Sequence, residues 1–299
     1  MKCAGCADAP KYRPGESVGA GYCGCDCQKE HWPSHKAFCK ALQQRKKLLR
    51  TAKILKVALL TYREVVFDLD LTRIDLRDGV LHIRQKLRPA TARAKRGRFP
   101  THLTSNPEHK EAVLANNQCT TAMALLGRLT RKLLAGVPCT IEVLDLEIGK
   151  PLVPTKLIPN QGMKPNCLLH TVLKFSLRPS NEVWILDSTG CQYGFREVLV
   201  PYDSYLAKNE CRNMRDPAPY DASETTDLDF FSNLPFMNAT PAQRRDLDAE
   251  RQARRHFAVF VDSRVGAELL SGSDQQFRDR LESFAGQLKG HMLSLPKSQ

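Results

Sequence analysis

The spacing of cysteine and histidine residues near the start of the chain constrains its folding more than any other feature. Residues 21–40 read GYCGCDCQKEHWPSHKAFCK, and five soft metal ligands stand four residues apart there: Cys23, Cys27, His31, His35 and Cys39. A tetrahedral zinc ion takes four ligands at about 2.0–2.3 Å, whereas residues four apart on a helix have Cβ atoms about 5–6 Å apart. Two neighbours can therefore share an ion, but a third is out of reach. We expect the segment to break into shorter helices at Pro33.

Further ligands must then come from elsewhere, and they stand upstream. Cys3 and Cys6 form a Cys-x-x-Cys motif, and a loop with several Pro and Gly residues separates it from Cys23. No apolar core of a signal peptide precedes them, and the interspersed histidines favour a metal site over the disulfides of a secreted domain. The sequence therefore predicts a zinc-binding segment in a reducing, intracellular compartment.

The segment YCxxxCQKEHWPSHKxxC, residues 22–39, resembles the second half of a MYND-type zinc finger of fungal proteins. Gln28, Trp32 and Lys36 match residues that this family favours. In the family, four ligand pairs bind two zinc ions: the first and third pairs share one ion, and the second and fourth share the other. This chain lacks one Cys-x-x-Cys pair.

The resemblance implies that Cys3 and Cys6 are the second pair of the family. They would complete one zinc site with His35 and Cys39, and the third pair, Cys23 and Cys27, would keep half of another site. In the alternative arrangement Cys3 and Cys6 share the ion with Cys23 and Cys27. Either arrangement completes one site, and we expect one tightly bound zinc ion per chain.

The rest of the chain predicts an α+β fold: a small zinc finger (1–40), a linking helix (41–70) and one α+β domain with a central antiparallel sheet (71–299). Apolar residues with helical spacing predict a helix over 40–66. Strands are predicted at 79–87, 139–148, 168–177 and 182–189, and helices at 108–135, with a break near Asn116-Asn117, at 241–262 and at 273–293. Residues 208–238 have little pattern and predict a long loop.

The net charge of +13 raises the question of an anionic partner. Residues 84–98 hold seven Lys and Arg and no acidic residue, and residues 43–50 add four more. No aromatic residues alternate with the basic ones, so we expect at most weak, sequence-independent contact with nucleic acid through 84–98. No apolar run is long enough for a membrane span. We expect a protein of the nucleus or cytoplasm.

A second group of chemically active residues stands in the middle of the chain. Cys119 lies in a predicted helix, His170 early in one strand, and Asp187 late in the next. A thiol nucleophile needs an imidazole to take its proton and a third group to orient that imidazole. Asn116-Asn117 could begin the helix just before Cys119, and a helix N-terminus lowers the pKa of a thiol. The alternative is a buried helix cysteine without chemistry.

Residues 110–200 resemble a transglutaminase-like, papain-type domain. The run CTTAMALLGRLTRKLLAGVPCTIEV is similar to its cysteine helix and following strand, and HTVLKFSLRPSNEVWILDSTG to its paired strands. The resemblance implies Cys119 as nucleophile, His170 as base and Asp187 as the orienting group. The family often has a tryptophan beside the cysteine, and here Gln118 and Thr120 flank it.

Two classes of function follow from these features. The first is a zinc-binding interaction protein, because MYND-type fingers bind short proline-containing peptides, with the body as a platform. The second is a cysteine-dependent acyl transferase or hydrolase that carries a finger. We expect the first, with protein partners bound through the finger.

Overall fold

The computed structural model describes residues 2–87, 96–158, 169–220, 229, 232 and 234–296. Its helices and strands, with their bounds, are α1 (Cys25–Val65), β1 (Leu71–Arg77), β2 (Val80–Gln85), α2 (Pro107–Ala115), α3 (Cys119–Leu134), β3 (Cys139–Glu147), β4 (Thr155–Ile158), β5 (Leu169–Leu177), β6 (Val183–Leu186), β7 (Leu199–Pro201), α4 (Tyr202–Lys208), β8 (Arg212–Asn213), β9 (Ala218–Pro219), α6 (Pro235–Asn238), α7 (Pro241–Arg264) and α8 (Asp274–Leu293). Short 3₁₀ helices η1 (Thr101–Leu103), η2 (Gly190–Tyr193) and η3 (Ala267–Leu270) lie between them. The predicted α+β class is confirmed.

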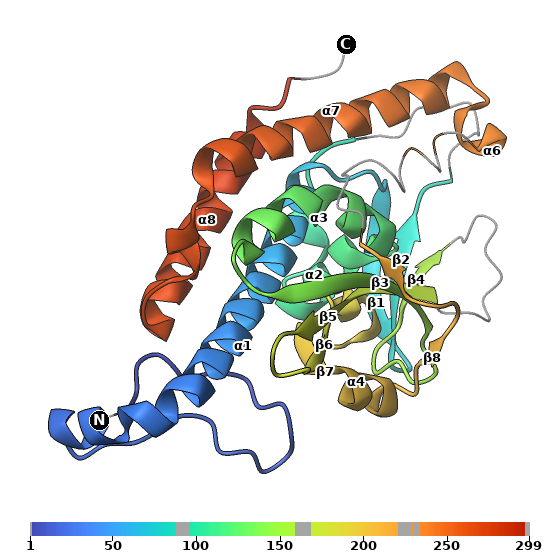
Figure 1. The fold of residues 1–299 in the computed structure, drawn as a ribbon. Coiled ribbons are helices and arrows are strands. Elements are labelled where there is room, and N and C mark those ends of the chain that lie inside the picture. The colour runs from blue at the N-terminus through green and yellow to red at the C-terminus, as the bar shows by residue number, and fades with distance from the viewer. Residues whose placement is uncertain are drawn as a thin grey trace.

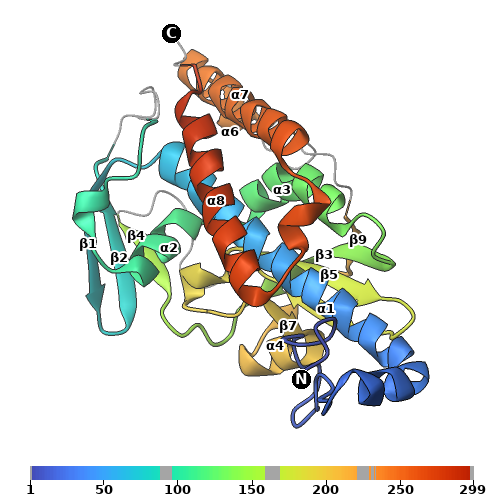
Figure 2. The same ribbon diagram turned by 90° about the vertical axis from the view of Figure 1, so that its left-hand side faces the viewer.

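The central sheet is antiparallel, with the strand order β7-β6-β5-β3-β8 and β9 paired to β3. A smaller sheet, β1-β2-β4, lies beside it (Figures 1 and 2). Leu173 and Phe175 of β5 point into a large core shared with α1, α3, α7 and α8. Val172, on the opposite face, packs in a second core with residues of η2 and α4. The sheet is therefore covered on both faces, as the alternation along β5 requires.

Helix α1 is the longest element, and it runs from the N-terminal loop through the core (Figures 1 and 2). Its buried side chains include Leu48, Leu55 and Leu59, each fully buried against the large core. The part of α1 that carries His35 and Cys39 extends beyond the body together with the N-terminal loop, at the lower left of Figure 1. One helix thus joins the predicted finger to the body.

The expected break of this segment at Pro33 is wrong. The helix is continuous from Cys25 and contains Pro33, and its first turns lie at an angle to the rest in Figures 1 and 2. A proline inside a helix removes one hydrogen bond and bends the helix. No break is needed, because α1 contributes only His35 and Cys39 to the cluster described below.

The predicted discontinuity near Asn116-Asn117 is confirmed, since α2 ends at Ala115 and α3 begins at Cys119. The expectation that an asparagine stands at the start of α3 is wrong, because Gln118 lies between Asn117 and the helix. Asn117 has a left-handed φ of 56°, a conformation that asparagine adopts more readily than most residues. Its N–H donates to the Gln192 side chain at 3.0 Å. The residue before α3 is Gln118, whose side chain makes no capping hydrogen bond.

Two of the basic residues counted in 43–50 do not face solvent. Arg45 and Arg50 are buried, and both form ion pairs with carboxylates of other elements. Three of the seven basic residues of the other stretch, 84–98, fall in 88–95, which lie outside the described residues. Within the described ranges, no helix combines the length and the apolar character needed to cross a membrane.

Candidate functional sites: a metal centre and a Cys-His-Asp trio

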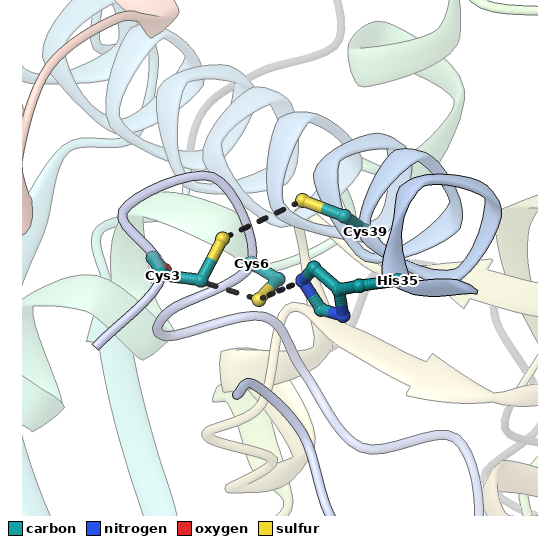
Figure 3. Close-up of side chains that lie close together, drawn as sticks. All are labelled: Cys3, Cys6, His35 and Cys39. Carbon is teal, nitrogen blue, oxygen red and sulfur yellow. Dashed lines mark hydrogen bonds between the residues drawn. The ribbon is translucent and has the colours of Figure 1, made fainter. Parts of the chain in front are cut away.

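Four of the six predicted metal ligands converge at the N-terminal end of the structure (Figure 3). They are Cys3, Cys6, His35 and Cys39, and their ligand atoms all lie within 4.8 Å of one another. All four side chains are buried. The group could hold a metal ion, because thiolate sulfur and imidazole nitrogen are soft ligands of the kind that bind zinc and other transition metals.

The local structure explains how the four ligands meet. His35 and Cys39 are four residues apart on α1 and so lie on one face of the helix. Cys3 and Cys6 come from a tight turn, and the Cys3 N–H donates to the Ala20 carbonyl at 2.9 Å. The Cys3 and Cys39 sulfurs lie 3.7 Å apart, too far for a disulfide bond. The Cys6 sulfur lies 3.5 Å from Nε2 of His35.

Two further residues, Gln43 and Gly5, contact or approach this cluster, and the position of each in the sequence indicates its role. The Gln43 side-chain amide donates to the Cys39 sulfur at 3.2 Å, and Gln43 stands one helical turn after Cys39. Gly5 lies so close to them that a Cβ there would come within 2.6 Å of Gln43 Nε2 and 3.0 Å of the Cys39 sulfur. The glycine between the two cysteines therefore allows the turn to approach the helix.

The other two predicted ligands, Cys23 and Cys27, are not part of this cluster. Cys23 is exposed just before α1, and Cys27 is partly exposed in its first turn. His31 is also outside the cluster, and its Nδ1 is hydrogen-bonded to the Tyr22 hydroxyl at 3.1 Å. The alternative set that joins Cys3 and Cys6 to Cys23 and Cys27 does not form in the part of the chain that the structure describes.

Burial and mutual repulsion oppose charging all three thiols of the cluster when no cation is present. Burial raises the pKa of Cys6 and of Cys39, and the neighbouring Cys3 thiolate raises both further. Burial also acts against ionisation of Cys3, but hydrogen bonds, that of His35 foremost, hold the pKa of Cys3 well below its ordinary value. A bound cation would relieve the repulsion, because a coordinated thiol is deprotonated.

The second predicted group, Cys119, His170 and Asp187, also comes together. Nε2 of His170 lies 3.0 Å from Oδ2 of Asp187, and both side chains are buried. Nδ1 of His170 is buried and has no well-formed hydrogen bond within the described ranges. Cys119 is the first residue of α3 and remains partly exposed. The imidazole of His170 and the backbone of Thr171 and Thr120 lie near its thiol and act on its pKa.

The pKa values of this trio are displaced toward a thiolate and an imidazolium. Burial alone would raise the pKa of Cys119, but the hydrogen bond and positive charge of His170 outweigh it, and the pKa is lowered. Burial would lower the pKa of His170, but the Asp187 carboxylate and then the Cys119 thiol raise it to about 10. The pKa of Asp187 is lowered, because its interactions with His170 exceed the effect of burial.

Sequence reasoning missed the residues that hold Asp187. The Tyr205 hydroxyl of α4 donates to Oδ2 at 2.7 Å, and the Thr189 N–H donates to Oδ1 at 3.1 Å. Thr189 follows Asp187 by two residues, a spacing at which an aspartate often accepts from the backbone. No sequence pattern marks Tyr205, because its contact depends on how α4 packs on the sheet.

The metal cluster generates a prediction about which thiols bind the ion. Protein purified with Cys3→Ser should contain no metal, whereas the matched variant Cys23→Ser should keep one ion per chain, because Cys23 lies outside the cluster. Metal-free protein should also unfold at its N-terminal end at lower temperature, since binding free energy is folding free energy in small metal sites. Elemental mass spectrometry and circular dichroism measure both. Full metal content in both Cys3→Ser and Cys39→Ser would contradict the assignment.

The trio generates a prediction about pH. A thiolate reacts and a thiol does not, so a lowered pKa moves the alkylation midpoint of Cys119 below the value of about 8.5 for free cysteine. Asp187→Asn removes the charge that stabilises the imidazolium, and the midpoint should rise by about one unit or more. Peptide mapping after iodoacetamide treatment at several pH values measures this. Cys139, whose pKa burial raises, is the internal control; equal midpoints for the two thiols would contradict the prediction.

Comparison of the chain with protein-family models, with curated proteins and with solved structures gave no match. No family is assigned to the chain on this basis. The MYND-type and papain-type resemblances therefore remain hypotheses, and the roles of the two sites rest on the geometry of their own residues.

Proposed function

We propose that this protein is a cysteine-dependent acyl transferase or hydrolase. Cys119 is the nucleophile, His170 the general base and acid, and Asp187 the group that orients the imidazole. The observation that carries the proposal is the convergence of the three residues, which come from the start of a helix, from β5, and from the position directly after the neighbouring β6. Their pKa shifts, toward thiolate and imidazolium, are those that thiol chemistry requires near neutral pH.

The chemistry follows from these roles. The Cys119 thiolate attacks the carbonyl carbon of an ester or amide, a C–S bond forms, and the C–O or C–N bond breaks as the His170 imidazolium gives its proton to the leaving group. Water or an amine then attacks the thioester while His170 takes its proton, and the thiolate leaves. Cys119 stands at the start of α3, and the first backbone N–H groups of a helix, which have no partner within it, are suited to hold an oxyanion.

Within the same proposal, the ion at Cys3, Cys6, His35 and Cys39 is zinc, with a structural role. A tetrahedral zinc ion with ordinary bond lengths requires about 3.8 Å between two sulfurs and about 3.6 Å between sulfur and nitrogen. The observed distances are 3.7 Å for Cys3 to Cys39 and 3.5 Å for Cys6 to His35. Four protein ligands leave no open position for a substrate, as in structural zinc sites. None of the ten described cysteines is in a disulfide bond, which suits a reducing compartment.

An activated ester tests the thiol chemistry. Incubation of the full chain with 4-nitrophenyl acetate should release nitrophenol and leave an acetyl group on Cys119, which peptide mass spectrometry detects. Cys119→Ala should abolish the adduct, and His170→Ala should slow its formation by about 10²–10⁴, the usual contribution of a general base. Cys191→Ala, which removes a buried thiol of raised pKa, is the matched control. The proposal would be refuted if wild type and Cys119→Ala were acetylated to the same extent and the wild-type adducts lay only on other cysteines.

A second candidate function is protein interaction through the finger, and the exposed aromatic side chains of α1 favour it. Trp32 and Phe38 are 40% and 42% exposed, and their rings lie 6.2 and 6.1 Å from the ring of His35. Large aromatic residues that stay exposed beside a rigid element are typical of binding surfaces. The MYND resemblance suggests short proline-containing peptides as the partners.

Peptide binding tests this second candidate. An immobilised array of proline-containing peptides should capture the full chain, and Trp32→Ala should weaken capture at least about tenfold, as loss of a central aromatic residue does in interfaces. Leu293→Ala, which removes an exposed apolar side chain from α8, should leave capture unchanged. Equal effects of the two variants would argue against the finger as the binding surface.

A further inference from the structure

The N-terminal loop touches the body at the strand that leads to the thiol site. This loop, residues 7–21, connects the Cys-x-x-Cys turn to the start of α1. The Tyr12 ring packs on Trp184 of β6 with 5.2 Å between centroids, and Trp184 is fully buried. The Tyr12 hydroxyl accepts a hydrogen bond from the Val183 N–H at 3.2 Å. A single loop residue therefore contacts the first two residues of β6, whose end immediately precedes Asp187.

A buried arginine stabilises this contact between the loop and β6. Arg45 of α1 donates from Nε and Nη2 to the two carboxylate oxygens of Glu182 at 2.7 and 2.6 Å. It donates from Nη1 and Nη2 to the two oxygens of Glu16 at 2.9 Å each. Its guanidinium also lies 5.8 Å from the Tyr12 ring centroid. One side chain thus binds α1, the loop and the start of β6 together through paired forks, which are stronger than neutral hydrogen bonds.

The other end of the loop is fastened at the metal cluster. Cys6 precedes the loop, and Cys3, in the same turn, donates its N–H to the Ala20 carbonyl near the end of the loop at 2.9 Å. The Lys46 ammonium donates to the Ala7 carbonyl at 2.9 Å. The loop has little regular structure of its own, so its shape depends on these anchors. Metal binding would fix the first of them.

We propose that the metal-held loop positions β6 and, through it, Asp187, so that occupancy of the metal site controls the reactivity of Cys119. In this arrangement Tyr12 and Arg45 are positioning residues of the trio. The inference rests on the thiol chemistry proposed above and adds its regulation.

The path from the loop to the thiol is short and made of packed groups. β6 is only four residues long. Tyr12 of the loop binds its first residue, and Arg45 binds Glu182 directly before it. Asp187 follows its last residue and is fixed by its N–H, which donates to the Val198 carbonyl at 3.0 Å. A displacement of β6 would lengthen the 3.0 Å bond between Asp187 and His170, and catalytic groups tolerate displacements of less than about 1 Å. The imidazolium would then lose its partner, and Cys119 its low pKa.

Hydrogen exchange tests whether the loop holds the strand. Amides of residues 183–187 should exchange at least about fivefold faster in Tyr12→Phe, which removes the hydroxyl and keeps the ring, and in wild type after chelation of the metal, because each loses an anchor of the strand. Amides of β3 should not change. Arg50→Lys is the matched control. Arg50 is as buried as Arg45 on the same helix, but it binds Asp274 and the carbonyls before α8. Unchanged exchange at 183–187 in both treated proteins overturns the proposal.

The pH profile of Cys119 alkylation tests whether the pKa of Cys119 changes when the loop or the metal is perturbed. The midpoint should rise toward the ordinary cysteine value in Tyr12→Phe and in metal-free protein, and should stay in place in Arg50→Lys. Faster exchange at 183–187 with an unmoved midpoint overturns the positioning role. If wild-type Cys119 titrates as an ordinary thiol, the proposed enzyme function fails, and the regulation of its thiol fails with it. A low wild-type midpoint that metal removal does not move overturns the regulation alone.

Discussion

The burial of helix α1 is the constraint on which the rest of the structure depends. Its apolar side chains, Leu48, Leu55 and Leu59 among them, are fully buried in the core that α3, α7, α8 and the central sheet share. Each such side chain contributes roughly 1.5–3 kcal/mol when it leaves water. The same helix carries His35 and Cys39 in the part that extends beyond the body, so the burial that stabilises the body also fixes the direction from which two metal ligands approach Cys3 and Cys6.

Three buried arginines of α1 form ion pairs with carboxylates. Arg45, Arg50 and Arg63 of α1 each donate to a carboxylate in a different part of the chain, at Glu182, Asp274 and Asp68. The Arg45–Glu182 pair is buried on both sides, and removal of one partner of such a pair leaves an uncompensated charge and is strongly destabilising. The pairs with Glu182 and Asp274 therefore connect α1 to the start of β6 and to α8. Because each arginine is paired with a carboxylate, these pairs leave the net charge of +13 on the rest of the chain.

The sequence predicted the elements whose patterns are local and missed those whose patterns are not. The helices of 241–262 and 273–293 were found because each has a long helical pattern, and both begin with capping boxes, at Thr240 and Ser273. Strand β1 was missed because a register shift between Leu71 and Arg73 disrupts its alternation. The two-residue strands β8 and β9 are too short to carry a period, so the region predicted as a long loop contains them.

The sequence by itself determined which residues could carry chemistry: the spacing of Cys3, Cys6, His35 and Cys39 and the order of Cys119, His170 and Asp187 are written in it. It left open which ligand pairs share an ion, because both arrangements satisfy the same spacing. The tertiary structure decided for His35 and Cys39, since a continuous α1 turns these two toward the Cys-x-x-Cys turn and leaves Cys23 exposed just before the helix. Tyr205 and Tyr12, far from Asp187 in sequence, reach it or its strand only through packing. Such contacts depend on how whole elements dock, and no local pattern records that.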